Sequence, residues 1–263
     1  LKSALLRLDE RRRLGAVPAF RRLVIETTGL ADPVPILSTL LNDPELRHHY
    51  RLGAVLTTVD AVNGGRDIAQ REEALKQVAV ADRLVISKTD LATPAAVRAL
   101  RAQLAAINPR AGTLDAAAAD AGLLRAADVY DPQSLPADVA AWLGGEGAHH
   151  HHPAYQTLGL TLDEAIDWTA FGLWLTMLLH VHGNRILRVK GLLRLADSDT
   201  PVVINGVQHL VHPPFHLARW PDDDRRSRLV FITEGLAVDA LRESLAVFNQ
   251  LGARFRPATD CAA

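Results

Sequence analysis

The sequence predicts a parallel α/β sheet in its first half, followed by a small α+β domain. Three short apolar runs, at 23–25, 54–59 and 84–86, lie about thirty residues apart and are rich in β-branched residues. Apolar runs that are continuous rather than alternating indicate strands buried on both faces. Their spacing leaves room for a crossover helix between successive strands. We therefore expect a sheet covered by helices on both faces.

The segments around these runs carry helix signals. Leu1, Leu5 and Leu8 lie on one face of a helix at the start of the chain. Further helices are expected over 35–41, behind an Asp-Pro turn, and over 67–80. A fourth begins at Thr93-Pro94, because Thr is a good N-cap and Pro is favoured at the first helical position.

The second half of the chain has a different pattern. An alanine-rich stretch, 116–127, predicts a peripheral helix, and the glycine-rich segment before 149–152 has linker composition. Beyond it we expect, in chain order, a strand (155–162), a helix (168–181), three strands (185–195, 201–211 and 228–233) and a closing helix (238–251). This βαβββα order predicts domains over 1–148 and 155–263, joined by a histidine-rich linker over 149–154.

Composition limits the classes of function. Hydrophobic residues make up 48% and charged residues 22%, as in ordinary globular proteins. The formal net charge of −1 argues against nucleic-acid binding, which usually needs a basic excess. The longest apolar stretch, 171–179, is about half of the ~20 residues that span a bilayer. The single cysteine, Cys261, excludes a disulfide framework and fits a reducing, cytoplasmic location.

The sharpest chemical signal is Ser87-Lys88-Thr89-Asp90, directly after the third apolar run. In P-loop GTPases an [NST]-K-x-D tetrapeptide in this position reads guanine: the aspartate accepts from N1–H and the exocyclic amine, and the lysine stem lies along the base. Adenine offers no such pair of donors, and a buried carboxylate left unpaired costs about 1–3 kcal/mol. The alternative is a helix N-terminal turn with a solvated Lys88 and a capping Asp90.

A second signal, Glu26-Thr27-Thr28-Gly29, follows the first apolar run. A carboxylate at a strand tip suits a water-mediated hold on Mg²⁺, and a glycine amide can approach a γ-phosphate closely. The alternative is a strand-ending turn capped by Thr and Gly. Asp60 ends the middle run at the same edge of the predicted sheet, where capping and a role near a nucleotide both stay open.

On these residues the sequence resembles the CobW-like family of P-loop GTPases, the cobalamin-synthesis and metallochaperone branch. The matching segments run in collinear order through nearly the whole chain: LVIETTGLADP at 23–33, VDAV at 59–62, QVAVADRLVISKTDL at 77–91, INPRA at 107–111, RVKG at 188–191 and SRLVFI at 227–232. The resemblance implies a P-loop GTPase fold, with GTP and Mg²⁺ as ligands.

The resemblance also implies roles for single residues. Glu26 and Gly29 would belong to the catalytic Mg²⁺/γ-phosphate switch, with Thr27 and Thr28 beside the nucleotide. Ser87, Lys88 and Asp90 would bind the guanine. Ser87 replaces the commoner Asn, so a contact to guanine N7 would be weaker or absent.

Two family features are missing from these 263 residues. No Gly-Lys pair occurs, so the strand and the G-x-x-x-x-G-K-[ST] loop that cradle the phosphates are not present. The family's C-x-C-C metal motif is also missing. We therefore expect an N-terminally incomplete GTPase domain, whose ordered form includes upstream residues or a neighbour that fills the gap. Alone, these residues should read a base but bind a triphosphate weakly and be inactive as a GTPase.

The linker carries four consecutive histidines, His149, His150, His151 and His152. Imidazoles suit Zn²⁺, Co²⁺ or Ni²⁺, and a flexible run of them makes a weak, exchangeable site. The resemblance implies a metal buffer here, because the family often has His-rich stretches between its domains. The alternative is a solvated linker.

Two hypotheses follow. The first is a GTP-binding and GTP-hydrolysing metallochaperone that delivers Zn²⁺ or Co²⁺ to a client metalloprotein, with a link to cobalamin synthesis and the oligomeric state left open. It predicts GTP, GDP, a transition metal and a client as partners, and neither nucleic acid nor membrane. The second is a non-catalytic interaction module that binds a client without nucleotide turnover.

Overall fold

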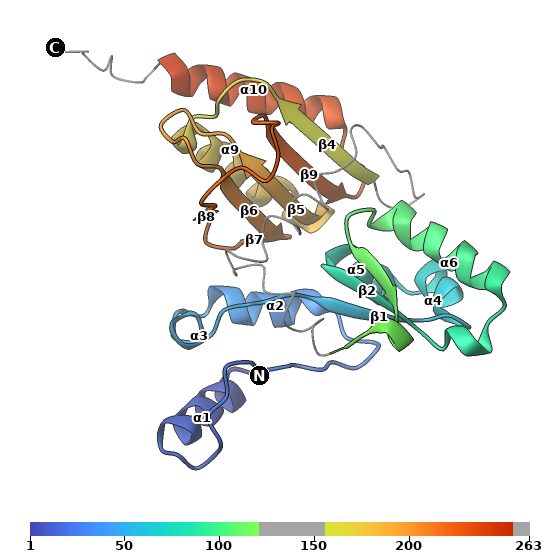
Figure 1. The fold of residues 1–263 in the computed structure, drawn as a ribbon. Helices are drawn as coiled ribbons and strands as arrows, with labels where there is room; N and C mark the ends of the chain where they lie inside the picture. Colours follow the sequence, from blue (N-terminus) through green and yellow to red (C-terminus); the bar gives the residue numbers. More distant parts are fainter. Residues whose placement is uncertain (121–155, 255–263) are drawn as a thin grey trace. The chain divides into compact units, whose positions relative to one another are not determined.

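The computed structural model describes residues 1–120 and 156–254 (Figure 1). The chain divides into two compact units, Leu1–Asp131 and Pro132–Ala263. The first unit is a parallel α/β structure and the second an antiparallel sheet with helices, which confirms the predicted fold class. The predicted linker, 149–154, lies outside the described residues, so the domain boundaries at 148 and 155 stay a prediction.

The sheet of the first unit has three parallel strands in the order β1-β2-β3. They are β1 (Leu56–Asp60), β2 (Arg83–Ser87) and β3 (Gly112–Asp115). Asp60 lies opposite Ser87, and Ile86 lies opposite Asp115. The carboxyl ends of all three strands therefore meet at one edge of the sheet, where open α/β sheets bind ligands. The strands predicted at 54–59 and 84–86 are confirmed.

Helices supply the rest of this unit. They are α1 (Lys2–Arg13), α2 (Pro33–Asn42), α3 (Pro44–His49), α4 (Gly64–Gln70), α5 (Glu72–Val80) and α6 (Pro94–Ile107). The helix expected over 67–80 is broken at Arg71, whose backbone is extended. Gly64 allows α4 to approach β1, because a Cβ there would lie 2.5 Å from Val59 Cγ1. Leu84 and Ile86 on one face of β2 and Val85 on the other are all buried, as expected for a strand covered on both faces.

The prediction of a strand at 23–25 is wrong. This run has no regular secondary structure and pairs with no strand in the part of the chain that the structure describes, and Val24 is 66% exposed. A strand needs a neighbour to pair its backbone groups, and within residues 1–120 β1 pairs with β2 alone. Conversely, β3 was not predicted. Its four residues contain little apolar periodicity, and pairing with β2 decides its conformation.

A buried carboxylate holds α1 on α3. Asp9 is 3% exposed, and its side chain accepts from Arg12 at 2.7 Å and lies 3.1 Å from His49 Nδ1. Tyr50 donates its hydroxyl to the Leu5 carbonyl of α1 at 2.9 Å. The first helix is therefore attached mainly through polar contacts, which fits its weakly apolar sequence.

Asn108, in the INPRA segment, fastens the end of α6 to the turn between α5 and β2. Its side chain is buried, and its Nδ2 lies 2.9, 3.1 and 2.9 Å from the carbonyl oxygens of Val78, Ala79 and Ala81. Its Oδ1 accepts from the Ala111 amide at 3.1 Å. One side chain thus satisfies several buried backbone groups just before β2 begins.

The second unit follows the predicted βαβββα order. Its elements are β4 (Gln156–Leu162), α9 (Trp168–His182), β5 (Ile186–Leu193), β6 (Val202–Val207), β7 (Leu210–Val211), β8 (Phe215–His216), β9 (Ser227–Thr233) and α10 (Val238–Arg254). The sheet order is β4-β9-β5-β6-β7, all pairs are antiparallel, and β8 pairs with β6. The strand predicted over 201–211 is the β6-β7 hairpin.

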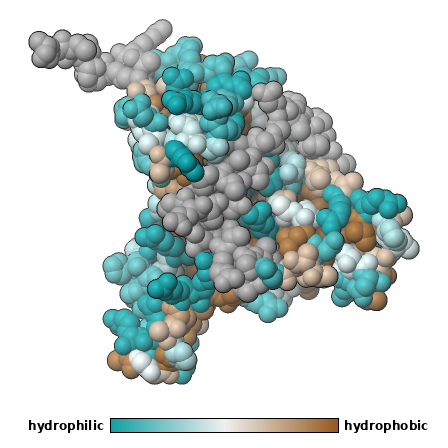
Figure 2. Space-filling model, in the orientation of Figure 1, coloured by the Kyte–Doolittle hydropathy of each residue, from teal (hydrophilic) through white to brown (hydrophobic). Residues whose placement is uncertain are grey.

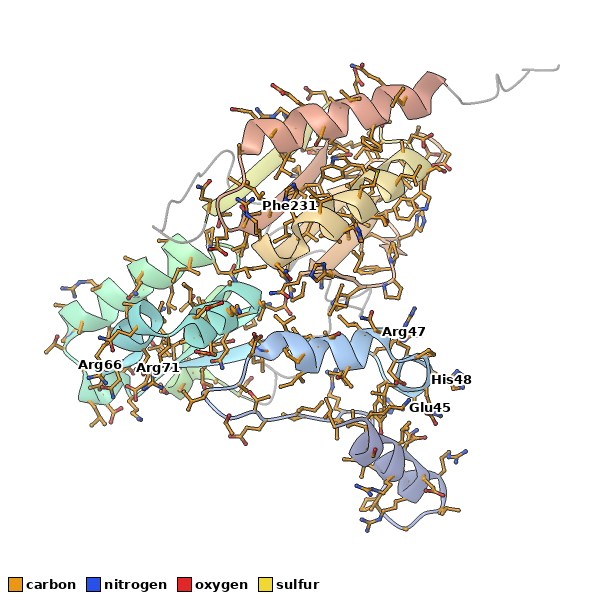
Figure 3. All side chains as sticks on the ribbon, turned by 180° about the vertical axis from the view of Figure 1, so that it is seen from behind. Glu45, Arg47, His48, Arg66, Arg71 and Phe231 are labelled. Atoms are coloured by element: carbon orange, nitrogen blue, oxygen red, sulfur yellow. The ribbon has the colours of Figure 1, made fainter. Side chains whose placement is uncertain are left out.

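The core of this unit lies between the sheet and the helices α9 and α10. Phe231 of β9, labelled in Figure 3, is fully buried. Trp174 of α9 packs edge-on against it, with ring centroids 6.2 Å apart, and is 2% exposed. Trp174 also donates its indole N–H to Ser244 Oγ of α10 at 3.0 Å. The prediction that Trp174 packs the core is confirmed.

No helix in the described residues is long and apolar enough to cross a membrane. The surface over α10 in Figure 2 is mostly hydrophilic, consistent with a helix that buries one face.

Replacing Asn108 with Ala should lower the free energy of unfolding of the first unit by about 2–4 kcal/mol, because buried carbonyls lose their donor. Urea unfolding followed by circular dichroism measures this. Asn42→Ala is the control, because the Asn42 side chain is exposed and makes one long hydrogen bond, at 3.5 Å to Ser38. Equal effects of the two changes would contradict the stabilising role given to the Asn108 side chain.

Candidate functional site

The candidate site lies at the carboxyl ends of β1 and β2. The Ala61 amide donates to the Ser87 carbonyl at 2.9 Å, and Ser87 Oγ donates to the Val59 carbonyl at 3.5 Å. These bonds continue the pairing of the two strands beyond their last residues. They fix where Ser87 ends and the next residue turns away from the sheet.

Lys88 makes that turn in a left-handed conformation, with φ 57° and ψ 33°. A non-glycine residue in this region costs of order 1 kcal/mol and persists where its surroundings hold it in place. Here the holding contact is an ion pair: Lys88 Nζ lies 2.5 Å from Asp60 Oδ2. The backbone and the ammonium group of Lys88 are therefore both fixed, while its side chain stays 55% exposed.

Asp60 is bound on both carboxylate oxygens. Its Oδ1 accepts from the backbone N–H groups of Val62, at 2.7 Å, and Asn63, at 3.2 Å. The hydrogen bond from Lys88, together with these N–H donors, lowers the pKa of Asp60 to about 2 from its ordinary 3.8. Asp60 thus caps the turn into α4 and orients Lys88 at the same time. The capping role is therefore confirmed, and the role near a nucleotide stays a prediction.

Asp90 lies in the single 3₁₀ turn Thr89–Leu91 that follows Lys88. Its carboxylate is exposed, and within residues 1–120 and 156–254 it makes no hydrogen bond or ion pair. The helix after it is capped by Thr93, whose Oγ1 accepts from the Ala96 amide at 3.2 Å. Asp90 is therefore available to accept hydrogen bonds from a ligand.

A third strand tip, which sequence reasoning missed, completes this edge. β3 ends at Asp115, beside Ile86, and is followed by the turn Ala116–Ala118, whose residues are exposed. The Asp115 carboxylate accepts a hydrogen bond from the Arg101 side chain at 2.6 Å. Small side chains here leave backbone groups accessible next to the Ser87–Asp90 segment. The only signal in the sequence was the small-residue run that follows Asp115.

The other predicted segment, Glu26 to Gly29, lies against α5 rather than against Ser87–Asp90. Glu26, Thr27 and Thr28 are exposed, and their side chains make no hydrogen bond within the described part of the chain. The Thr28 carbonyl accepts from the Ala31 amide at 3.0 Å, which forms a turn around Gly29. No hydrogen bond joins this segment to Ser87–Asp90 among the described residues.

The segment ends at Asp32, which caps α2. Asp32 Oδ1 accepts from the Val34 amide at 2.9 Å, and Lys76 Nζ of α5 lies 3.3 Å from its Oδ2. Lys76 also pairs with Glu72 at 2.7 Å. The hydrogen bond to Glu72 and the charge of Asp32 raise the pKa of Lys76, so its ammonium group stays protonated at neutral pH.

The predicted metal ligands cannot be placed. His149, His150, His151 and His152 lie outside the described residues. Within residues 1–120 and 156–254, no group of three His, Cys, Asp or Glu side chains is arranged to hold a metal ion.

Two protein families match the chain. Residues 1–115 match the family described as CobW/HypB/UreG, nucleotide-binding domain. Residues 155–249 match the cobalamin synthesis protein cobW C-terminal domain. The two matched ranges correspond to the two units of the structure.

Individual relatives give the same result. Zinc chaperone YjiA of Escherichia coli (strain K12) is 31% identical over 253 residues, with 94% of this chain and 76% of YjiA covered. Zinc-regulated GTPase metalloprotein activator 1 of Schizosaccharomyces pombe is 32% identical over 90 residues, 34% of this chain and 22% of the relative. The crystal structure of Zn(II)-bound YjiA GTPase from E. coli superposes with a TM-score of 0.75, covering 94% of this chain and 77% of that chain at 29% identity.

Asp60→Asn should remove part of the acid sensitivity of the first unit. Because the folded-state pKa of Asp60 is about 2 and its ordinary value is 3.8, its ionised form stabilises the fold above about pH 4. That contribution is lost as the pH falls towards 2. The difference in unfolding free energy between the wild type and Asp60→Asn should therefore shrink from pH 5 to pH 2.5.

Urea titrations followed by circular dichroism at several pH values measure this difference. Asp223→Asn is the control, because Asp223 is an exposed carboxylate in the second unit. A difference between wild type and Asp60→Asn that stays constant over this range would contradict the role given to the ion pair.

Proposed function

Because the chain belongs to the CobW family of nucleotide-binding proteins, we propose that it acts in a GTP-dependent metallochaperone that handles zinc. The observation that carries the nucleotide part is the exposed carboxylate of Asp90, which has no partner among the described residues, beside a lysine fixed by Asp60. The zinc part is supported by the names of its relatives, zinc chaperone YjiA among them.

The base-reading step follows from hydrogen-bond chemistry. Guanine presents N1–H and an exocyclic amine side by side, and one carboxylate, as in Asp90, accepts from both. Lys88 provides an aliphatic stem for the face of the base, and its ammonium group is kept away from the donors by Asp60. Since Asp90 has no partner among the described residues, binding guanine breaks no existing hydrogen bond of that side chain.

The γ-phosphate end is assigned to Glu26 and Gly29, with Thr27 and Thr28 beside the nucleotide. Glu26 is an exposed carboxylate with no partner in the described part of the chain, which suits a water-mediated hold on Mg²⁺. Mg²⁺ would supply charge neutralisation of the phosphates. Gly29 is exposed, and a Cβ built on it would meet nothing within 4 Å, so a ligand has room beside its Cα. The 263 residues contain no Gly-Lys pair, so the proposal assigns no phosphate-cradling loop.

The cargo and its destination complete the proposal. We assign Zn²⁺ as the metal, with Co²⁺ as the alternative, and a client metalloprotein as the acceptor. The relative named zinc-regulated GTPase metalloprotein activator 1 supports delivery to a client. In this reading the GTP state governs when the metal is released. A contribution to cobalamin synthesis would require the Co²⁺ alternative.

Asp90 variants test the base-reading step in the natural protein. Asp90→Ala should weaken guanine nucleotide binding about tenfold to a hundredfold, because both donors of the base lose their acceptor. Asp90→Asn should shift preference towards xanthosine nucleotides, since xanthine carries a carbonyl where guanine carries its amine, and an amide can donate to it. Calorimetry with GDP and xanthosine diphosphate measures both effects.

Asp223→Asn is again the control and should leave the affinities unchanged. A wild-type protein indifferent to every nucleotide would instead favour the non-catalytic interaction module. Unchanged guanine affinity in both Asp90 variants would overturn the assignment of Asp90.

Replacing His149, His150, His151 and His152 together with alanine should remove a weak, exchangeable Zn²⁺ site and leave nucleotide affinity unchanged. Equilibrium dialysis with Zn²⁺, repeated with Co²⁺ as competitor, measures the number of ions bound and the preference between them. Replacement of His180 and His182 of α9 is the control, because it removes exposed and half-buried imidazoles elsewhere. Equal zinc uptake by the wild type and the tetrad variant would show that the linker is no metal site.

A further inference from the structure

One residue of α5, Gln77, contacts both the loop around Gly29 and the strand β1, which ends at the Lys88 ion pair. On one side its Nε2 donates to the Ala31 carbonyl at 2.8 Å and to the Gly29 carbonyl at 3.3 Å. Both hydrogens of the carboxamide are thereby used. The segment assigned to the γ-phosphate is thus held through its own backbone.

On its other side Gln77 is joined to β1. Its backbone carbonyl accepts from Thr57 Oγ1 at 2.8 Å. The Thr57 residue is 8% exposed and lies three positions before Asp60 on the same strand. Gln77 therefore contacts the strand that ends at the Lys88 ion pair as well as the loop that contains Gly29.

The loop has little else to hold it. Leu30 is 63% exposed, and Gly29 has no side chain and open space where one would be. Burial of apolar surface, which normally fixes a loop, is thus small here. Within residues 1–120 and 156–254, the polar restraints on the loop are the Thr28–Ala31 turn, the ion pair of Lys76 with Asp32, and the two hydrogen bonds from Gln77.

Of these restraints, Gln77 is the one that reaches Gly29 from another element. Lys76 binds Asp32 at the start of α2, and the turn is internal to the loop. A glycine amide that must approach a phosphate has to be placed within a few tenths of an ångström, because hydrogen bonds weaken steeply with distance and angle. The hydrogen bond that Gln77 donates to the Gly29 carbonyl restrains the backbone next to that amide and so provides such placement.

We propose that Gln77 is a positioning residue for γ-phosphate recognition. It holds the Gly29 carbonyl at a fixed position relative to β1. The loop around Gly29 and the Ser87–Asp90 segment therefore keep a constant distance and orientation. This inference rests on the proposed GTP-binding function and deepens it. Gln77 contacts neither base nor phosphate, and acts through Gly29.

The test compares the affinities for a non-hydrolysable GTP analogue and for GDP in the natural protein. GDP lacks the γ-phosphate, so a residue that positions Gly29 affects the analogue selectively. Gln77→Glu keeps the length and shape of the side chain but, as a carboxylate, donates no hydrogen bond. It should lower the ratio of analogue affinity to GDP affinity about fivefold to tenfold, as expected for lost hydrogen bonds.

Gln103→Glu is a matched control in the same unit. Gln103 Nε2 likewise donates to a glycine carbonyl, that of Gly65, at 3.2 Å, but on α4 and away from the loop. This variant should keep the wild-type ratio. Thr57→Val removes the second link and should lower the ratio in the same direction as Gln77→Glu, by a smaller factor.

The outcomes are distinct. An unchanged ratio in Gln77→Glu overturns the inference and leaves the proposed function intact. An equal loss of affinity for both nucleotides also overturns it, because that result indicates a purely structural role. A wild-type protein that binds no nucleotide overturns the proposed function itself. Circular dichroism of each variant confirms folding, and Thr57→Val supplies the test if Gln77→Glu does not fold.

Discussion

The ion pair between Lys88 and Asp60 is the contact on which the candidate site depends. It joins the tips of two adjacent parallel strands and holds a lysine in a backbone conformation that is unfavourable by itself. Because the strands are in register, with Asp60 opposite Ser87, the pair forms without displacing either strand. The consequence is an edge where Asp90 is exposed and has no partner among the described residues, while Lys88 beside it is fixed.

Much of the fold could be predicted because local patterns and tertiary structure agree. The run around Ile86 is buried on both faces of β2, so a continuous apolar pattern was a reliable signal there. β1 buries Thr57 and Val59 on one face and leaves Thr58 exposed on the other. Thr93 caps α6 as its position before a proline predicts, and Trp174 is buried where helical periodicity places it. In the second unit, short connections between antiparallel strands left few alternative topologies.

The two errors in the strand predictions have one physical cause: a segment forms a strand only where a second segment pairs with its backbone. The run at 23–25 has strand composition, but no described strand lies beside it to complete its hydrogen bonds. β3 has few residues that favour strands, yet it is a strand because its backbone pairs with that of β2. The tetrapeptide Ser87–Asp90 could be found from the sequence because its residues are consecutive. The role of Gln77, which depends on contacts 20 and 48 residues away, could not.

A loop held by a few polar contacts differs in energy from one held by a core. Each hydrogen bond contributes about 1 kcal/mol net, so the bonds from Gln77 to the Gly29–Ala31 loop are strong enough to favour one position and weak enough to be exchanged. A ligand shifts such an equilibrium only by its difference in affinity for the two positions. A γ-phosphate contact to the Gly29 amide is of similar magnitude, so it reinforces the position of the loop that these bonds favour. A deeply buried loop would not respond at that energy. The exposure of Leu30 and the polar anchoring by Gln77 and Lys76 are therefore what a nucleotide-sensing segment requires.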